Sequence, residues 1–333
     1  MTDPGIESFW TWWPEAEVRI RAAIDARQLD EALIAEISAK VQAIHAKLTW
    51  ELGPGGTAQH AFCLSSGGEP ELRRLTERWF RAAPAADAFW EFHPSKPPAP
   101  GLADARLQIG EHTVPLGEMR FTVTLDPHRE LMIVTSFHGA FAAMPDEMRG
   151  MATFIVLDRV LGEDTVQRWL GSIRTSVEPL ENGAPFAMLI EAVGVLARDA
   201  TGERFTNLEG EAPDGRPLSA TVNLALKRID HIACDTHVSV DVALLAPTPD
   251  GLPTDDESDA LSDIEDELEE LITGDAVYFG RETAAGRRAL HWFAAADHPV
   301  RPALEAWAAR HADRDVRLTW SSDPRWATAE RFR

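Results

Sequence analysis

The chain has 333 residues, 44% of them hydrophobic, and its 32 Lys and Arg against 54 Asp and Glu give a formal net charge of 32 − 54 = −22. These values predict a soluble, folded protein of roughly two domains and exclude the collagenous, coiled-coil, disulfide-rich and disordered classes. The strong acidity also argues against non-specific binding to nucleic acid, which depends on Lys and Arg, and favours a basic partner.

Membrane insertion and secretion are not expected. The longest nearly apolar run, 184–197, is shorter than the ~20 residues that a bilayer requires, and it contains Glu191. The sequence opens without a basic segment followed by an apolar one, so the cytoplasm is the expected compartment. Cys63 and Cys234 allow one disulfide at most, and we expect both to be reduced, buried thiols.

The first part of the chain predicts two helices, at 18–24 and 33–44, because its apolar residues recur at helical spacing. Asp30 is the expected cap of the second helix. An aromatic opening precedes them, with Phe9, Trp10, Trp12 and Trp13. Strands are predicted at 48–52, 61–65 and 89–93, and a helix that contains Pro70 near its first turn lies between the last two.

The middle of the chain predicts a hairpin of strands 118–125 and 130–137. Helices near 148–161 and 163–170 and a strand near 172–177 follow. A strand pair at 220–227 and 236–245 precedes a helix at 254–273. Strands at 276–280, 289–294 and 316–320, with a helix at 299–311, complete the predicted elements.

The two ends of the chain share a pattern. Trp79 and Trp307 are 307 − 79 = 228 residues apart, and the same offset aligns further aromatic residues of both ends. We interpret this as an ancient duplication in which residues 48–93 and 276–321 superpose. The predicted fold is α+β, with repeated ferredoxin-like units whose antiparallel sheets are covered by helices. The predicted domains are 1–182 and 183–333.

Residues 250–275 contain 12 acidic residues and no Lys or Arg, and they predict an amphipathic helix. Thr254 and Glu257 have the spacing of a capping box. An apolar stripe, Leu261, Ile264, Leu268 and Leu271, is expected to pack inward. The outer faces carry four candidate binding residues, Asp259, Asp263, Glu267 and Glu270. Two interpretations stay open: these charges only keep the helix solvated, or they dock a basic protein surface.

Three further candidate binding residues lie nearer the C-terminus. Arg287 follows Gly286, which is expected to supply the positive φ of a bulged hairpin turn, and Arg287 either binds an anion or is only solvated. Asp323 is expected to cap or anchor the terminal segment, with Trp326 inserted against the C-terminal sheet. The aromatic residues near both ends either pin those ends to the body of the protein or form a shared aromatic groove.

No cofactor, metal or catalytic residue is predicted. The segment Gly53-Pro54-Gly55-Gly56 lacks the later residues of a dinucleotide-binding or phosphate-binding loop. His231, Cys234 and His237 are the best metal-ligand cluster by spacing. In a continuous strand, however, Cys234 would face away from both histidines, so three ligands could not converge there.

The C-terminal third resembles a bacterial family known only as domain of unknown function number 695. The resemblance is carried by Gly251-Leu252-Pro253, the acidic helix, Gly280 followed by Thr283, Gly286 and Arg287, and the closing Asp323-Pro324-Arg325-Trp326. It implies a bacterial protein but no activity. Two earlier segments, Phe9-Trp10-Thr11-Trp12 and Trp50-Glu51-Leu52-Gly53, look like the N-terminal portion of longer members. In shape and acidity the chain is also distantly similar to the B-type regulator of ribonuclease activity, a small acidic protein that binds ribonuclease E.

The sequence therefore favours a non-catalytic binding or regulatory module that uses the acidic helix or a groove between repeats. Its expected partner is a basic protein, with neither nucleic acid nor membrane involved. The alternative is an enzyme, such as a metal-assisted hydrolase, whose catalytic residues converge only in the fold.

Overall fold

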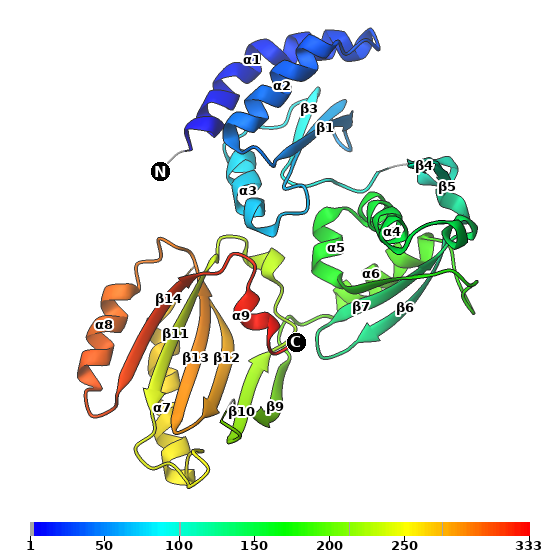
Figure 1. Cartoon of the computed structure of the whole chain (residues 1–333). Helices are drawn as coiled ribbons and strands as arrows, with labels where there is room; N and C mark the ends of the chain where they lie inside the picture. Colours follow the sequence, from blue (N-terminus) through cyan, green and yellow to red (C-terminus); the bar gives the residue numbers. More distant parts are fainter. Residues whose placement is uncertain (1–2, 100, 213, 275) are drawn as a thin grey trace. The chain divides into compact units, whose positions relative to one another are not determined.

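A computed structural model describes residues 3–99, 101–212, 214–274 and 276–333 (Figure 1). Unit 1 contains Met1–Leu107, Pro115–Gly117 and Met151–Val166, and unit 2 contains Gln108–Val114, Glu118–Gly150 and Gln167–Arg333. The domain boundary expected between residues 182 and 183 stays a prediction, and these two units divide the chain elsewhere. In the part of the chain that the structure describes, no helix combines the length and the apolar character of a membrane span.

Unit 1 begins with two helices, α1 (Pro4–Asp25) and α2 (Glu31–Ile44). Asp30 caps α2 as expected, because its Oδ1 accepts a hydrogen bond from the Leu33 amide at 2.7 Å. The prediction that the first helix starts at residue 18 is wrong. The aromatic opening belongs to α1, where Phe9, Trp13 and Ile20 share one buried stripe at helical spacing.

A small sheet follows, made of β1 (Thr49–Pro54), β2 (His60–Ser65) and β3 (Trp90–His93). Its order is β1-β2-β3, with β1 antiparallel and β3 parallel to β2. The connection from β2 to β3 contains η1 (Pro70–Leu72) and α3 (Arg73–Arg81). A helical crossover is what a parallel strand pair requires.

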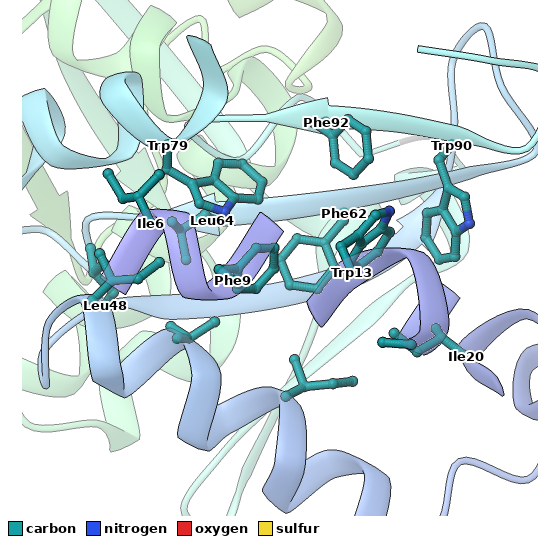
Figure 2. Close-up of a cluster of buried hydrophobic side chains, with 14 of the residues drawn as sticks. Ile6, Phe9, Trp13, Ile20, Leu48, Phe62, Leu64, Trp79, Trp90 and Phe92 are labelled. Atoms are coloured by element: carbon teal, nitrogen blue, oxygen red, sulfur yellow. The ribbon is translucent and has the colours of Figure 1, made fainter. Parts of the chain in front are cut away.

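Aromatic rings from these elements form the core of unit 1, as Figure 2 shows. The ring of Phe9 lies 5.6 Å, centroid to centroid, from the rings of both Phe62 and Trp79. Trp10 Nε1 donates a hydrogen bond to the carbonyl oxygen of Trp79 at 3.0 Å. The aromatic opening therefore pins the N-terminal helix to unit 1, the first of the two interpretations of these residues.

The middle of the chain contains the predicted hairpin, β6 (Arg120–Asp126) and β7 (Leu131–Phe137). β8 (Leu170–Ser176) adds to it parallel to β7, giving the sheet order β6-β7-β8. The remaining elements of this region are η2 (Leu102–Asp104), β4 (Arg106–Ile109), β5 (His112–Pro115), η3 (Leu116–Glu118), η4 (Gly139–Ala143), α4 (Asp146–Leu161), α5 (Glu163–Trp169) and α6 (Ala187–Asp199).

The C-terminal part forms a six-stranded antiparallel sheet of order β14-β11-β13-β12-β10-β9. Its strands are β9 (Phe205–Glu211), β10 (Pro217–Asn223), β11 (Thr236–Ala243), β12 (Ala276–Ala284), β13 (Arg287–Ala294) and β14 (Val316–Ser322). The accompanying helices are η5 (Arg228–His231), α7 (Asp255–Leu271), α8 (Arg301–Arg310) and α9 (Ala327–Glu330).

The two faces of this sheet are covered by different helices. Val238, Val240 and Val242 of β11 pack in one cluster with residues of α7 and α8. On the opposite face, Trp326 packs with Phe279 and other residues of β10, β12 and β13. Figure 1 shows α7 behind strands β11 and β13, with α9 in front of the sheet. On the face that α7 and α8 cover, the strands packed against these helices end with β12. The two remaining strands, β10 and β9, therefore extend beyond α7.

Gly280 marks an irregularity in β12. The register with β13 shifts between Tyr278 and Gly280, and the φ of Gly280 is +148°. A Cβ at this position would lie 2.3 Å from the carbonyl oxygen of Thr221 on β10. Glycine is therefore required for β12 to approach β10 at the bulge.

The α+β class is confirmed, whereas repeated ferredoxin-like units are not. Two hairpins do share a register, since Trp50 pairs with Leu64 and Tyr278 with Trp292 at the offset of 228. However, β3 pairs directly with β2, while β11 lies between β13 and β14. The expected superposition of residues 48–93 and 276–321 is therefore wrong. The predicted pairing of the two strands before the acidic helix is also wrong, because β10 and β11 bind different neighbours.

Candidate functional site

A cleft of about 570 Å³ lies in unit 2 where β9 and β10 extend beyond α7. Strand residues Phe205, Asn223 and Tyr278 line it from the sheet, and Glu269 lines it from α7. The end of the cleft is closed by the loop 201–203 and by residues of the β10–β11 connection, including Lys227, Asp230 and His231. The volume suits one small molecule or a few side chains of a partner.

Aromatic rings form one surface of the cleft. The ring of Tyr278 lies 6.1 Å from that of Phe205 and 5.1 Å from that of Trp292, centroid to centroid. Phe205 is 50% exposed, so its ring is accessible to a ligand. Burial, followed by the nearby charge of Glu265, raises the pKa of Tyr278, so its hydroxyl keeps its proton at neutral pH.

Carboxylates border this aromatic surface. Glu203 and Glu269 are exposed, and neither forms an ion pair with another residue that the structure describes. Asp230 forms an ion pair with Arg168. The ring of His231 stacks on Trp326 at 6.1 Å, and burial lowers its pKa, so this histidine is neutral near pH 7. The exposed, unpaired charges of the cleft are therefore negative, while the buried ammonium of Lys227 is a cation beneath them.

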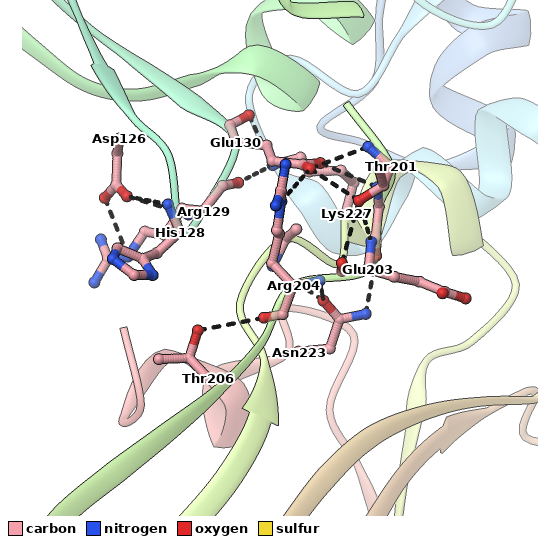
Figure 3. Close-up of polar contacts among 12 residues, drawn as sticks. Asp126, His128, Arg129, Glu130, Thr201, Glu203, Arg204, Thr206, Asn223 and Lys227 are labelled. Carbon is pink, nitrogen blue, oxygen red and sulfur yellow. Dashed lines mark hydrogen bonds and ion pairs between the residues drawn. The ribbon is translucent and has the colours of Figure 1, made fainter. Parts of the chain in front are cut away.

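The more deeply buried polar groups are committed to the backbone (Figure 3). Lys227 Nζ donates hydrogen bonds to the carbonyl oxygens of Arg129 and Glu130. Burial, and then the charge of Arg333, lower the pKa of Lys227 to about 8. Asn223 Oδ1 accepts from the amides of Arg204 and Ala225, and its Nδ2 donates to the carbonyl oxygen of Gly202.

Glu130 ties the turn after β6 to the loop beside the cleft. Its carboxylate accepts hydrogen bonds from the amides of Thr201 and Gly202 and from Arg204 Nε, each at 3.0 Å. Burial alone would raise the pKa of Glu130, but these donors outweigh it and lower that pKa. The network in Figure 3 is therefore a scaffold that holds the rim of the cleft in place.

The acidic helix forms as its pattern predicts. Thr254 Oγ1 accepts from the Glu257 amide, and Leu261, Ile264 and Leu268 are buried. Asp259, Asp263 and Glu270 are exposed, whereas Asp275 lies outside the described residues. Glu267 is exposed but engaged: its Oε2 accepts from Trp307 Nε1 at 2.8 Å and lies 3.0 Å from His311 Nε2. Glu267 thus holds α8 against α7.

Arg287 stands between two carboxylates. Its Nε lies 2.5 Å from Asp241 Oδ1, and its guanidinium also lies 2.8 Å from Asp315 Oδ2. Gly286 has the expected positive φ, +78°. An anion at Arg287 would have to displace or approach these two carboxylates, so the arrangement disfavours the anion-binding interpretation.

Asp323 and Trp326 anchor the C-terminal segment, as expected. Asp323 accepts hydrogen bonds from the amides of Ala327 and Thr328 at 2.7 and 2.9 Å. Trp326 is fully buried, stacks on Phe293 at 4.1 Å, and donates from Nε1 to the carbonyl oxygen of Cys234 at 2.7 Å. These contacts make both residues part of the structural support on the face of the sheet opposite α7.

The histidine and cysteine cluster does not converge. Strand β11 begins only at Thr236, so His231 and Cys234 lie before it. The alternation of side chains expected for a continuous strand therefore does not apply to these two residues. His237 Nε2 instead lies 3.1 Å from His291 Nδ1. Within the described residues no group of His, Cys, Asp and Glu is arranged to hold a metal ion. Both cysteines are buried and neither is in a disulfide, as expected.

Sequence reasoning missed most of the cleft. It did not identify β9, whose strand carries Phe205, and it passed over Lys227. A signal for Lys227 was present, because this residue is one of four lysines in the chain and directly follows the apolar residues 224–226 at the end of a predicted strand. A lysine in such a position, when buried, requires dedicated acceptors for its ammonium group.

Comparison with known proteins places the cleft mostly inside a recognised domain. Residues 211–332 match the "Family of unknown function (DUF695)", which confirms the resemblance seen in the C-terminal third. No curated protein and no solved structure matches the chain. The similarity to the B-type regulator of ribonuclease activity therefore stays an expectation.

Proposed function

We propose that unit 2 is a non-catalytic binding module whose cleft receives a cationic side chain of a basic partner protein. The observation that carries this proposal is the pairing of an accessible aromatic surface, Phe205 and Tyr278, with the unpaired carboxylates Glu203 and Glu269. A guanidinium or ammonium group between them gains a cation–π contact and an ion pair together. Each contributes about 0.5–1 kcal/mol at a partly exposed site.

A binding role fits the polar groups of the cleft better than catalysis does. Catalysis needs an acid, base or nucleophile that is presented to a substrate. Lys227 and Asn223 instead hold backbone groups, and His231 is stacked on Trp326. The cleft thus offers recognition surfaces rather than reactive groups.

The outer face of α7 extends the binding surface. Asp259, Asp263 and Glu270 are exposed and form no ion pairs with described residues, while the inward Glu257 and Glu265 are paired with arginines. A row of unpaired carboxylates on the helix that also lines the cleft attracts a basic surface and accelerates the encounter, more strongly at low salt. Arg287, which begins β13, and Asp323 and Trp326, which follow β14, stabilise the sheet on which α7 packs. The same charge repels nucleic acid and anionic membrane surfaces.

Binding of a fluorescein-labelled hexa-arginine peptide to the full chain, followed by fluorescence anisotropy, tests the cleft. We expect Phe205→Ala and Glu269→Gln each to weaken binding two- to fivefold, and the double variant to weaken it by about tenfold. Glu305→Gln is the matched control, because Glu305 is an exposed carboxylate on α8 with no ion pair to a described residue. It removes the same charge at a distance from the cleft.

A second variant separates steering from docking. The triple variant removes three charges from the outer face of α7: Asp259→Asn, Asp263→Asn and Glu270→Gln. It should lower the association rate of the peptide and the salt dependence of that rate, with little change in the dissociation rate. Glu267 is left intact because it holds α8. The proposal is wrong if the cleft double variant binds as tightly as the natural chain. It is equally wrong if Glu305→Gln weakens binding as much as Glu269→Gln does, since the peptide would then respond only to net charge.

A further inference from the structure

The outer edge of β6 already pairs with another segment of the chain at one position. Phe121 and Ala184 form an isolated antiparallel bridge, with the Phe121 amide donating to Ala184 O at 2.8 Å and the Ala184 amide donating to Phe121 O at 2.9 Å. An antiparallel neighbour would continue by pairing Asn182 with Val123. The chain turns away instead, because Asn182 has a φ of +59° and the Gly183 amide donates to Leu180 O.

The edge beyond Phe121 is therefore open. Backbone groups of successive strand residues point alternately to the two sides, so Val123 and Leu125 share the outward direction of Phe121. No other described residue forms a backbone hydrogen bond with the outward groups of Val123 or Leu125. Open edges of this kind are templates for an added strand.

An apolar groove of about 380 Å³ runs beside this edge, between β6 and α6. Val123 and Leu125 line it from β6, Met132 lines it from β7, and Met188 and Val195 line it from α6. Leu125 is 52% exposed and Val195 is 44% exposed. Every second side chain of a strand added to β6 would face the same side as Val123 and Leu125, which is the side of the groove.

Two carboxylates determine the chemistry of the occupant. Glu191 and Asp199 lie at the groove, are exposed, and form no ion pair with described residues. We propose that the β6 edge and the α6 groove bind an extended peptide segment of a partner protein, in which apolar residues alternate and basic residues flank them. The segment adds to β6 as an antiparallel strand, places its apolar side chains in the groove, and sets its basic flanks against Glu191 and Asp199.

A second copy of this chain is a poorer occupant of the edge. Two such edges would bring together the same acidic rims on chains that each carry a net charge of −22. Like charges opposed across an interface reduce affinity, whereas a basic peptide gains from them. The charge at the groove thus favours a different chain as the partner.

The test uses the full chain and a synthetic peptide of alternating valine and threonine with lysines at both ends. Binding is measured by calorimetry, and the added strand is detected by amide hydrogen exchange of Val123 and Leu125. We expect both amides to become protected when the peptide binds. The same peptide, N-methylated at the amides that face β6, should bind at least tenfold more weakly, because it cannot form the strand hydrogen bonds.

Variants of the protein separate the parts of the site. Leu125→Ala should weaken binding two- to fivefold, while Leu245→Ala, at a leucine that is 55% exposed and distant in sequence, should leave it unchanged. Glu191→Gln with Asp199→Asn should weaken binding and reduce its salt dependence, whereas Asp259→Asn on α7 should not. Equal affinity for the methylated peptide overturns the proposal, as does unchanged exchange of Val123 and Leu125. Protection of these amides in a peptide-free dimer would assign the edge to a second copy and also overturn it.

Discussion

Replacing Trp326 by alanine should destabilise unit 2 by about 3–5 kcal/mol, the range for emptying a large aromatic site in a core. The indole is fully buried, and its ring is nearly parallel to Phe293, with an interplanar angle of 11° and a centroid distance of 4.1 Å. Its Nε1–H is the hydrogen-bond donor for the carbonyl oxygen of Cys234 at 2.7 Å. The variant therefore loses apolar contact, stacking and a hydrogen bond at one position.

Trp326→Phe divides this loss into its parts. Phenylalanine keeps a ring against Phe293 but removes the indole N–H that donates to the Cys234 carbonyl, and the loss of one such hydrogen bond costs about 0.5–1.5 kcal/mol. Urea unfolding of the full chain, followed by far-ultraviolet circular dichroism, gives the free energies. If the two units unfold separately, the change belongs to the transition of unit 2. A loss below about 1 kcal/mol for the alanine variant would refute the inserted position of Trp326, since only the removal of a solvent-exposed ring changes the free energy of unfolding so little.

Three further predictions concern backbone strain and pH. Ala285 is exposed and has a φ of +53° in the β12–β13 turn, a left-handed conformation that strains alanine more than asparagine. Ala285→Asn should therefore raise the free energy of unfolding in urea by up to about 1 kcal/mol. A loss of stability would contradict this argument. Burial and then the nearby His291 lower the pKa of His237 to about 4, below its value of about 6.5 in the unfolded chain. The stabilisation that comes from keeping His237 neutral should therefore be fully present above pH 6.5. The free energy of unfolding should then fall by up to about 3 kcal/mol as the pH drops to 4. His237→Asn should flatten that pH profile, and an unchanged slope would assign it to other groups. Asp158 in α4 has a buried Oδ1 without a hydrogen-bond partner in the described structure, and burial followed by the charge of Glu163 raises its pKa to about 7. Asp158→Asn should therefore stabilise the protein at pH 8, by up to about 2 kcal/mol once solvent screening is allowed for. It should have no such effect at pH 5, where the carboxyl group is already protonated. Equal effects at both pH values would contradict this reasoning.

Local patterns predicted local structure well in this chain. Thr254 and the apolar stripe of α7 identified the helix because capping and helical periodicity depend on residues a few positions apart. Trp326 was predicted to insert because a large aromatic ring near a chain end gains most by packing on the body of the protein. The hairpin of β6 and β7 was recognised from its turn for the same local reason.

Long-range pairing was not predictable in the same way. Arg287 was considered for anion binding, but its partners Asp241 and Asp315 come from β11 and the α8–β14 connection, which the sheet order alone brings beside it. The cleft depends on the position of β9 at the sheet edge and on how far α7 covers the sheet. Neither is encoded in periodicity, because periodicity says which face of an element is buried but not which element buries it.

The position of β11 inside the sheet, between β13 and β14, has a consequence for synthesis of the chain. This strand emerges from the ribosome before β13 and β14, the two strands that flank it in the finished sheet. Until residues 287–322 have been made, its alternating Val238, Val240 and Val242 lie in a segment with two unsatisfied edges, the kind of segment through which nascent chains aggregate. The residues translated immediately afterwards are those of the acidic α7, and adjacent charge of one sign keeps such segments apart. We therefore expect the carboxylates of α7 to limit aggregation of the β11 segment during translation, before the sheet exists.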